Sequence, residues 1–207
     1  MSRRKLLLFI IAITAWASLI AQLVLSFGYS TTGTTETLVR FFSFFTVLTN
    51  TLVAFFASVQ LFSKPQQQGF FANANTQTAI TMYITIVGLV FNLVLRDLWK
   101  EGGLQALLND LLHSVIPVLM IIYWWRYVDG KKATYKSIPF WLVYPAVYAI
   151  YTLLRGPFAT WYPYPFINVI ELGYPAVLRN SAILVLVFLF FSFFFVFLGK
   201  KKPAQSY

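Results

Sequence analysis

Long apolar runs alternate with short polar connectors along the whole chain. These runs cover six segments, at about residues 5–27, 38–62, 76–95, 104–127, 138–155 and 178–198. Most of them come close to the roughly 20 residues that a helix needs to cross about 30 Å of hydrocarbon. Because the backbone in lipid must satisfy its own hydrogen bonds, such runs form helices and not open strands. The pattern predicts an all-α, polytopic membrane protein built as a bundle of six transmembrane helices.

The first and fifth runs each have a feature that needs an explanation. The first run follows a basic segment at residues 2–5 and continues to Phe27, so it is longer than the apolar part of a signal peptide. It has no convincing cleavage site, and we interpret it as a transmembrane span. The fifth run contains Pro139 and Pro145, which membrane helices tolerate better than soluble ones. Since no internal repeat or low-complexity linker occurs, residues 1–207 are expected to form a single transmembrane domain.

Positive charges gather on one side of the predicted bundle. An even number of spans puts both termini on one side, together with Arg3, Arg4, Lys5, Lys64, Arg126, Lys131, Lys132, Lys136, Lys200, Lys201 and Lys202. The other side holds Arg40, Arg96, Lys100, Arg155 and Arg179, so eleven of the 16 basic residues lie beside the termini. Cytoplasmic loops carry the excess of Lys and Arg. The N and C termini are therefore expected to be cytoplasmic.

The composition excludes several classes of function. Hydrophobic residues make up 59% of the chain and charged residues only 11%, against about 25% charged in soluble domains. The net charge of +10 lies in short clusters between apolar runs, so it indicates topology and not nucleic-acid binding. The absence of cysteine excludes disulfides and thiolate chemistry. A single histidine cannot give paired haem ligation, and His113 with Asp110 offers too few ligands for a metal, so no cofactor or metal is expected.

Polar side chains inside the second and fourth runs are the candidates for function, because polar groups are costly in lipid and usually face the bundle interior. In the second run, Ser43, Thr46 and Asn50 have helical spacing and are predicted to share one face. In the fourth run, Asn109 and Asp110 lie one turn from His113, the only histidine in the chain. Each of these residues also has a simpler interpretation, as hydrogen-bonding contacts that hold helices together.

Depth in the membrane connects the two runs. Thr46 and His113 each lie eight or nine residues past the outer end of their predicted helix. At 1.5 Å per residue, both side chains lie roughly 12–14 Å below that end. If the two helices are neighbours, the hydroxyl and the imidazole are expected to meet. Asp110, one turn nearer the outside, is expected to accept a hydrogen bond from the imidazole or to pair with a cation.

Cations for such a pair stand at the outer ends of the last two runs. Arg155 ends the fifth run and Arg179 opens the sixth, with Glu171 in the connector between them. Together with Asp110, these residues predict a polar, aromatic-rimmed pocket that opens toward the outer leaflet. A guanidinium there is suited to a carboxylate or a phosphate headgroup. The alternative is that Asp110 serves only as a buried partner for Arg155 or Arg179.

Three short motifs give the sequence a resemblance to a known family. They are the segment 40–50 (RFFSFFTVLTN), the segment 109–117 (NDLLHSVIP), and Arg155-Gly156 followed by 161–166 (WYPYPF). The chain resembles a bacterial six-helix membrane family that is distantly similar to the eukaryotic androgen-induced and androgen-dependent membrane proteins. Those proteins hydrolyse fatty acid esters of hydroxy fatty acids. The resemblance implies a bacterial cytoplasmic membrane protein with membrane lipids as its surroundings and a lipid or fatty acid ester as its substrate.

The resemblance also implies a catalytic pair, since an intramembrane threonine and a histidine act together in those hydrolases. The histidine corresponds to His113, within the pattern Asn109-x-x-x-His113. The hydroxyl corresponds to Thr46 or to Ser43, depending on how the second run is aligned, and depth favours Thr46. Asn50, Asn109 or an arginine is expected to donate hydrogen bonds to an oxyanion.

Two functions therefore stay open at the level of sequence. The first is an intramembrane lipid-ester hydrolase, in which an imidazole activates a hydroxyl nucleophile. The second is a non-catalytic protein that binds a lipid or small ligand, such as a transporter or sensor, with Arg155, Arg179 and Asp110 holding a headgroup.

Overall fold

A computed structural model describes residues 1–63, 69–99 and 102–202 of the chain. Within these ranges the chain forms helices and turns without any strand. The α-helices are α1 (Arg3–Gly28), α2 (Thr34–Phe42), α3 (Phe45–Phe62), α4 (Ala74–Val90), α5 (Gly103–Asp110), α6 (Ile116–Tyr127), α7 (Ile138–Ala159) and α8 (Val169–Lys201). Among the described residues, six helices are long and apolar enough to cross a membrane. The prediction of an all-α, six-span membrane protein is thus confirmed.

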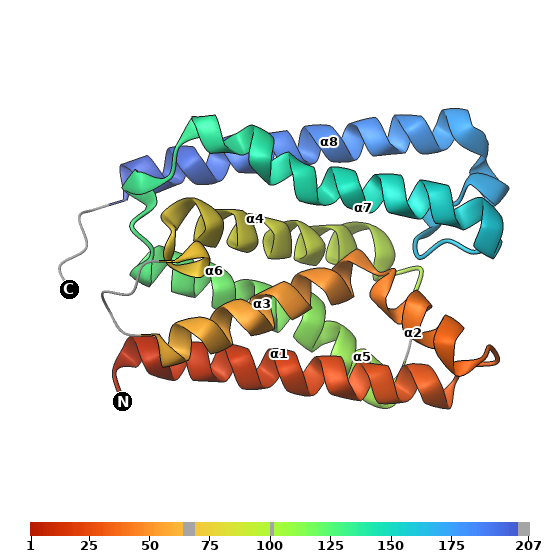
Figure 1. Cartoon of the computed structure of the whole chain (residues 1–207), viewed down its shortest axis with the longest axis horizontal. Coiled ribbons are helices and arrows are strands. Elements are labelled where there is room, and N and C mark those ends of the chain that lie inside the picture. Colours follow the sequence, from red (N-terminus) through yellow and green to blue (C-terminus); the bar gives the residue numbers. More distant parts are fainter. Residues whose placement is uncertain (64–68, 100–101, 203–207) are drawn as a thin grey trace.

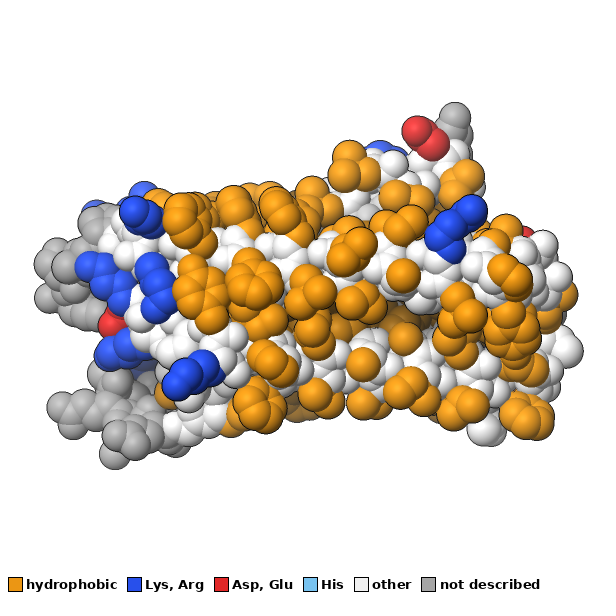
Figure 2. All heavy atoms as spheres, turned by 90° about the horizontal axis from the view of Figure 1, so that it is seen from above, with side chains coloured by type: hydrophobic (Ala, Val, Ile, Leu, Met, Phe, Trp, Pro, Cys, Tyr) orange, Lys and Arg blue, Asp and Glu red, His pale blue; other side chains and the backbone are white. Residues whose placement is uncertain are grey.

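The helices form a bundle around α4 (Figure 1). Helix α4 contacts α3, α6 and α8, while α1 packs along α3 and α7 packs along α8. The start of α1 and the end of α8 lie at the same end of the bundle, which we call the terminal end (Figure 1). Figure 2 shows hydrophobic side chains along the length of the molecule and Lys and Arg side chains gathered mainly near the terminal end. Lys64 and Lys100, which entered the charge comparison, lie outside the described residues.

The second predicted span, 38–62, is broken in the structure. It divides into α2 and α3, with Ser43 and the extended residue Phe44 (φ −81°, ψ 125°) between them. The break is held by contacts across the fold, since Tyr148 of α7 donates its hydroxyl to the Ser43 carbonyl at 3.0 Å. Ser43 therefore does not share a helical face with Thr46, and that prediction is wrong for Ser43.

The connector predicted at 156–177 is shorter than expected. Helix α7 continues to Ala159, and α8 begins at Val169 and bends at Gly173, whose φ of 72° lies in the left-handed region. The remaining connector, residues 160–168, lies at the end of the bundle opposite the terminal end (Figure 1). We call this connector the cap, because its side chains fold over the ends of the helices.

Two short π-helical segments interrupt the helical spans near the cap. One (η2, Phe91–Leu95) continues α4, and the other (η3, Leu111–Val115) joins α5 to α6. The two segments contact each other. A π-turn inserts one extra residue and shifts the phase of a helix, which is why such segments are frequent at functional sites. His113 lies in the second of them.

Candidate functional site

The structure brings the hydroxyl of Thr46 and the imidazole of His113 together. Nε2 of His113 lies 3.2 Å from Oγ1 of Thr46, although the two residues are 67 positions apart in sequence. Thr46 is the second residue of α3, and His113 lies in the π-helical segment before α6. Both side chains are buried. The second and fourth spans are therefore neighbours at this depth.

The other ring nitrogen of His113 fixes the tautomer. Nδ1 lies 2.9 Å from the backbone carbonyl oxygen of Asn109. A carbonyl only accepts hydrogen bonds, so Nδ1 must carry the proton. In the neutral imidazole Nε2 is then an acceptor, and the hydroxyl of Thr46 is its donor. This arrangement has the geometry of a nucleophile and a base whose orientation is set by a third group.

Helix α4 and its continuation η2 form the wall behind His113. The imidazole stacks on the ring of Phe91, with 3.8 Å between ring centroids and 12° between ring planes. The amide of Asn92 donates to the carbonyl oxygens of Gly88, at 2.8 Å, and of His113, at 3.1 Å. These contacts satisfy carbonyls near the π-helical segments, and they hold the backbone of His113 against α4.

Gly88 makes this close approach possible, and its replacement is expected to disturb the site. A Cβ at position 88 would lie 2.8 Å from the carbonyl oxygen of His113, a backbone atom that cannot rotate away. We expect Gly88→Ala to destabilise the protein by about 1–3 kcal/mol, as overpacking does. The measurement is the thermal unfolding temperature in detergent.

Gly28→Ala is the matched control, because a Cβ there meets nothing within 4 Å. Equal stability of Gly88→Ala and Gly28→Ala would contradict the close packing of α4 against His113.

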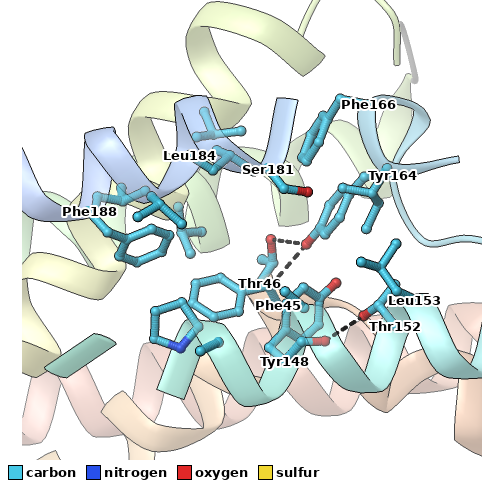
Figure 3. A pocket seen from close by; sticks show the side chains of 18 of the residues that line it. Phe45, Thr46, Tyr148, Thr152, Leu153, Tyr164, Phe166, Ser181, Leu184 and Phe188 are labelled. Atoms are coloured by element: carbon cyan, nitrogen blue, oxygen red, sulfur yellow. Dashed lines mark hydrogen bonds between the residues drawn. The ribbon is translucent and has the colours of Figure 1, made fainter. Parts of the chain in front are cut away.

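Tyr164 is a site residue that the sequence analysis missed. Its phenol oxygen accepts from the backbone N–H of Thr46 at 3.1 Å and lies 3.2 Å from Thr46 Oγ1 (Figure 3). Because Thr46 gives its hydroxyl proton to His113, Tyr164 is the donor to Thr46 Oγ1. A chain of hydrogen bonds therefore runs from Tyr164 through Thr46 and His113 to the carbonyl of Asn109. The segment 161–166 entered the sequence analysis only as one of the three motifs of the family resemblance, without a role for Tyr164.

Stacked rings hold Tyr164 over the site. Its ring stacks on Phe166, with 5.2 Å between centroids and 6° between planes, and on Trp99, with 6.2 Å between centroids. A second aromatic residue of the cap, Trp161, lies beneath the guanidinium groups of Arg40 and Arg155. The two arginines share one carboxylate oxygen of Glu36, each at 2.7 Å. The cap is thus tied to α2 and α7.

The Glu36 ion pairs are expected to make the stability of the protein depend on pH. The hydrogen bonds from Arg40 and then from Arg155 hold the pKa of Glu36 below its ordinary value. A lowered carboxyl pKa contributes stability above the unfolded pKa, and that stability is lost as pH falls through the folded pKa. We expect Glu36→Gln to lower the unfolding temperature at neutral pH, with the difference from wild type disappearing at acidic pH.

Glu171→Gln provides the control, because Glu171 is exposed and forms no ion pair with the described residues. The same pH profile in Glu36→Gln and wild type would show that the two ion pairs do not stabilise the cap.

A cavity of about 290 Å³ opens beside Thr46 and Tyr164 (Figure 3). It is lined by side chains of α3, α4, η2, α7, α8 and the cap, and almost all of them are apolar. The lining side chains that carry a hydroxyl are Thr46, Tyr148, Thr152, Tyr164 and Ser181. His113 does not line the cavity and lies behind Thr46. The cavity is therefore suited to an apolar chain with one polar group near Thr46.

Ser43 and Asn50 have structural partners. The hydroxyl of Ser43 donates to the carbonyl of Val39 at 2.7 Å and lies 3.0 Å from the phenol of Tyr151. The amide of Asn50 donates to the carbonyl oxygens of Thr46 and Leu112. Among the described residues neither side chain forms a hydrogen bond with the imidazole of His113, so Thr46 provides the hydroxyl at the imidazole.

The predicted cationic pocket does not form. Asp110 pairs with Arg96 at 2.7 Å, and both side chains are about half exposed. Arg155 pairs with Glu36, and Arg179 is exposed at the surface of α8. The π-helical segment explains in part why Asp110 faces Arg96 and not the imidazole. Asp110 precedes this segment and His113 lies within it, so the segment changes the angle between the two side chains around the helix.

Asn109 contributes its backbone carbonyl to His113, while its side-chain oxygen accepts a hydrogen bond from Gln105 at 3.3 Å. Within the part of the chain that the structure describes, no three His, Cys, Asp or Glu side chains are grouped to hold a metal ion. Comparisons of the chain with protein-family models, with curated proteins and with solved structures find no match.

Proposed function

We propose that the protein is an intramembrane hydrolase of fatty acid esters, with Thr46 as the nucleophile and His113 as the general base. The observation that carries this proposal is the hydrogen bond between the Thr46 hydroxyl and Nε2 of His113, whose opposite nitrogen is held by a carbonyl. A hydroxyl becomes an effective nucleophile when an adjacent base removes its proton. The resemblance of three sequence motifs to a family related to fatty acid ester hydrolases supports the same chemistry.

The reaction follows from this geometry in two steps. Oγ1 of Thr46 attacks the ester carbonyl carbon while its proton passes to Nε2 of His113. His113 then gives that proton to the departing alcohol oxygen as the bond between the carbonyl carbon and that oxygen breaks. An acyl group remains on Thr46, and water attacks its carbonyl carbon while His113 accepts a proton from the water. His113 then gives this proton to Oγ1 of Thr46 as the bond between the acyl carbon and Oγ1 breaks, which releases the fatty acid and restores the hydroxyl.

The oxyanion of each step needs hydrogen-bond donors, and Tyr164 is in reach to provide one. Its hydroxyl lies 3.2 Å from Thr46 Oγ1, the atom to which the reacting carbon binds. Thr46 also stands in the first turn of α3, where the helix dipole favours negative charge. Tyr164 and the start of α3 thus take the role that the sequence analysis gave to Asn50, because the amide of Asn50 donates to backbone carbonyls. Removal of one oxyanion donor typically lowers kcat by about 10²–10³.

The proposal includes an orientation in the membrane. Lys and Arg gather mainly near the terminal end, so the termini are assigned to the cytoplasm and the cap to the outer side. The cavity then lies in the outer half of a bacterial cytoplasmic membrane, where the surrounding lipids contain ester bonds. Membrane lipids are the partners that this placement implies.

A second function, non-catalytic binding of a fatty acid or lipid, is favoured by the apolar lining of the cavity. In this version Thr46 and Tyr164 hold the polar end of the ligand and no bond is broken. Arg155 and Asp110 play no part in it, because they are paired with Glu36 and Arg96 and do not line the cavity.

One experiment separates the two functions. Purified protein in lipid nanodiscs is mixed with a medium-chain fatty acid ester, and released fatty acid is measured over time. Binding of the product fatty acid is measured in parallel by displacement of a fluorescent fatty acid. We expect release of fatty acid by the wild-type protein. Displacement without any release would reject hydrolysis in favour of binding.

A further inference from the structure

The hydroxyls of the cavity that are not used on backbone carbonyls gather at one end. Tyr148 and Thr152 donate to the carbonyl oxygens of Ser43 and Tyr148. Thr46, Tyr164 and Ser181 lie near the cap, and Figure 3 shows the hydroxyl of Ser181 on the side of the cavity where Tyr164 lies. Ser181 has no hydrogen-bond partner in the residues that the structure describes, so its hydroxyl is free for a ligand. Phe188, two turns further along α8, lies on the other side from Tyr164 (Figure 3). A ligand with one polar end and one apolar end therefore has a single favoured direction.

The far end of the cavity is closed by packed rings. Phe188 is 7% exposed, and its ring packs against Phe45 at 5.9 Å and Tyr83 at 6.4 Å between centroids. Tyr144 completes the group, at 5.0 Å from both Phe45 and Tyr83. The four residues come from α8, α3, α4 and α7, so their rings fill the space between these helices at this end of the cavity. Of the four, Phe45 and Phe188 line the cavity, and Phe188 is the one that lies away from Thr46 along the chain.

The size of the cavity limits what fits between the two ends. From Ser181 to Phe188 the helix α8 rises by roughly 10 Å. A dry apolar cavity of about 150 Å³ holds one benzene molecule, which has six carbon atoms. By that measure the 290 Å³ cavity holds about twelve carbons, which fit between the two ends only as a bent chain.

We propose that the site takes a single medium-length acyl chain, of about twelve carbons, with its carbonyl at Thr46 and its tail against Phe188. Phe188 is then the residue that determines chain length. That the acyl chain belongs to a substrate rests on the proposed hydrolase function. Binding of the chain in the cavity does not require turnover, and the experiment therefore measures binding.

The test measures displacement of a fluorescent fatty acid by a series of saturated fatty acids that range from shorter to longer than the cavity. We expect the affinity of the wild-type protein to rise with each added methylene to about twelve carbons and to rise no further beyond them. In Phe188→Ala, the chain length beyond which affinity no longer rises is expected to increase by about six carbons, because the ring removed has six carbons. In Leu184→Trp, which narrows the cavity between Ser181 and Phe188 (Figure 3), the optimum moves to shorter chains.

Phe190→Ala is the matched control, because this residue is on the same helix but 62% exposed and away from the cavity. Its optimum is expected to equal that of the wild type. If Phe188→Ala does not fold, Phe188→Leu and Leu184→Trp still test the claim in opposite directions. The inference is overturned by an affinity that increases steadily with chain length, or by an optimum that neither cavity variant changes.

Hydrolysis measured with esters of the same acyl series separates this inference from the proposed function. A chain-length optimum in binding without any turnover keeps the inference and rejects the hydrolase. Turnover that is independent of acyl length keeps the hydrolase and rejects the role of Phe188.

Discussion

Thr46→Ala is expected to abolish ester hydrolysis, with a loss in kcat of at least about 10⁴-fold, because removal of a nucleophile leaves only binding and oxyanion stabilisation. Fatty acid binding should persist, since the cavity keeps its apolar lining. Thr46→Ser is expected to retain most activity, because it keeps the hydroxyl that faces Nε2 of His113. The measurement is release of fatty acid at saturating ester, together with displacement of a fluorescent fatty acid.

Ser43→Ala is the informative control for this prediction. Ser43 is the other hydroxyl that the sequence motif allows, and it lies three residues from Thr46. Its hydroxyl is directed to Val39 and Tyr151 and not to the imidazole. We expect Ser43→Ala to hydrolyse the ester as fast as the wild type. The reverse pattern, with activity lost in Ser43→Ala and kept in Thr46→Ala, would transfer the role of nucleophile to Ser43.

His113→Ala is expected to lower kcat by about 10²–10⁴-fold, the usual contribution of a general base. KM should change little, because His113 stands behind Thr46 and does not line the cavity. A residue that only supported the fold would instead change the unfolding temperature and KM together. Steady-state kinetics and thermal unfolding, measured on the same preparation, distinguish these two outcomes.

Asp110→Asn is the control for the histidine variant. The sequence made this carboxylate a candidate partner of the imidazole, whereas the structure pairs it with Arg96. Its neutralisation should leave kcat unchanged. A loss of activity in Asp110→Asn as large as that in His113→Ala would contradict the orientation of the ring by the Asn109 carbonyl.

The helical spans were predictable because lipid imposes a simple rule on length and polarity. The break between α2 and α3 was not, because its causes are distant in sequence. Tyr148 and Tyr151 bind the Ser43 residue from α7, more than a hundred positions away. The early start of α8 was missed because the apolar run was taken to begin at residue 178, whereas the helix begins at Val169 and bends at Gly173.

The meeting of Thr46 and His113 was predictable from depth, because the two spans run in the same direction. The partners of Asp110 and Arg155 were not. Glu36, which binds Arg155, precedes the second apolar run and was not considered as a partner. Tyr164 reaches Thr46 from 118 positions away, and only the folding of the cap over α3 brings it there. Helical periodicity also failed near His113, since the π-helical segment changes the phase.

The most direct test of the central claim, that Thr46 is an activated nucleophile, is covalent labelling. The purified protein is treated with a fluorophosphonate probe, and the modified residue is identified by peptide mass mapping. We predict a single adduct on Thr46 that is absent in His113→Ala and unchanged in Ser43→Ala. An adduct on Ser43, or no adduct on a protein shown to be folded by fatty acid binding, would contradict it.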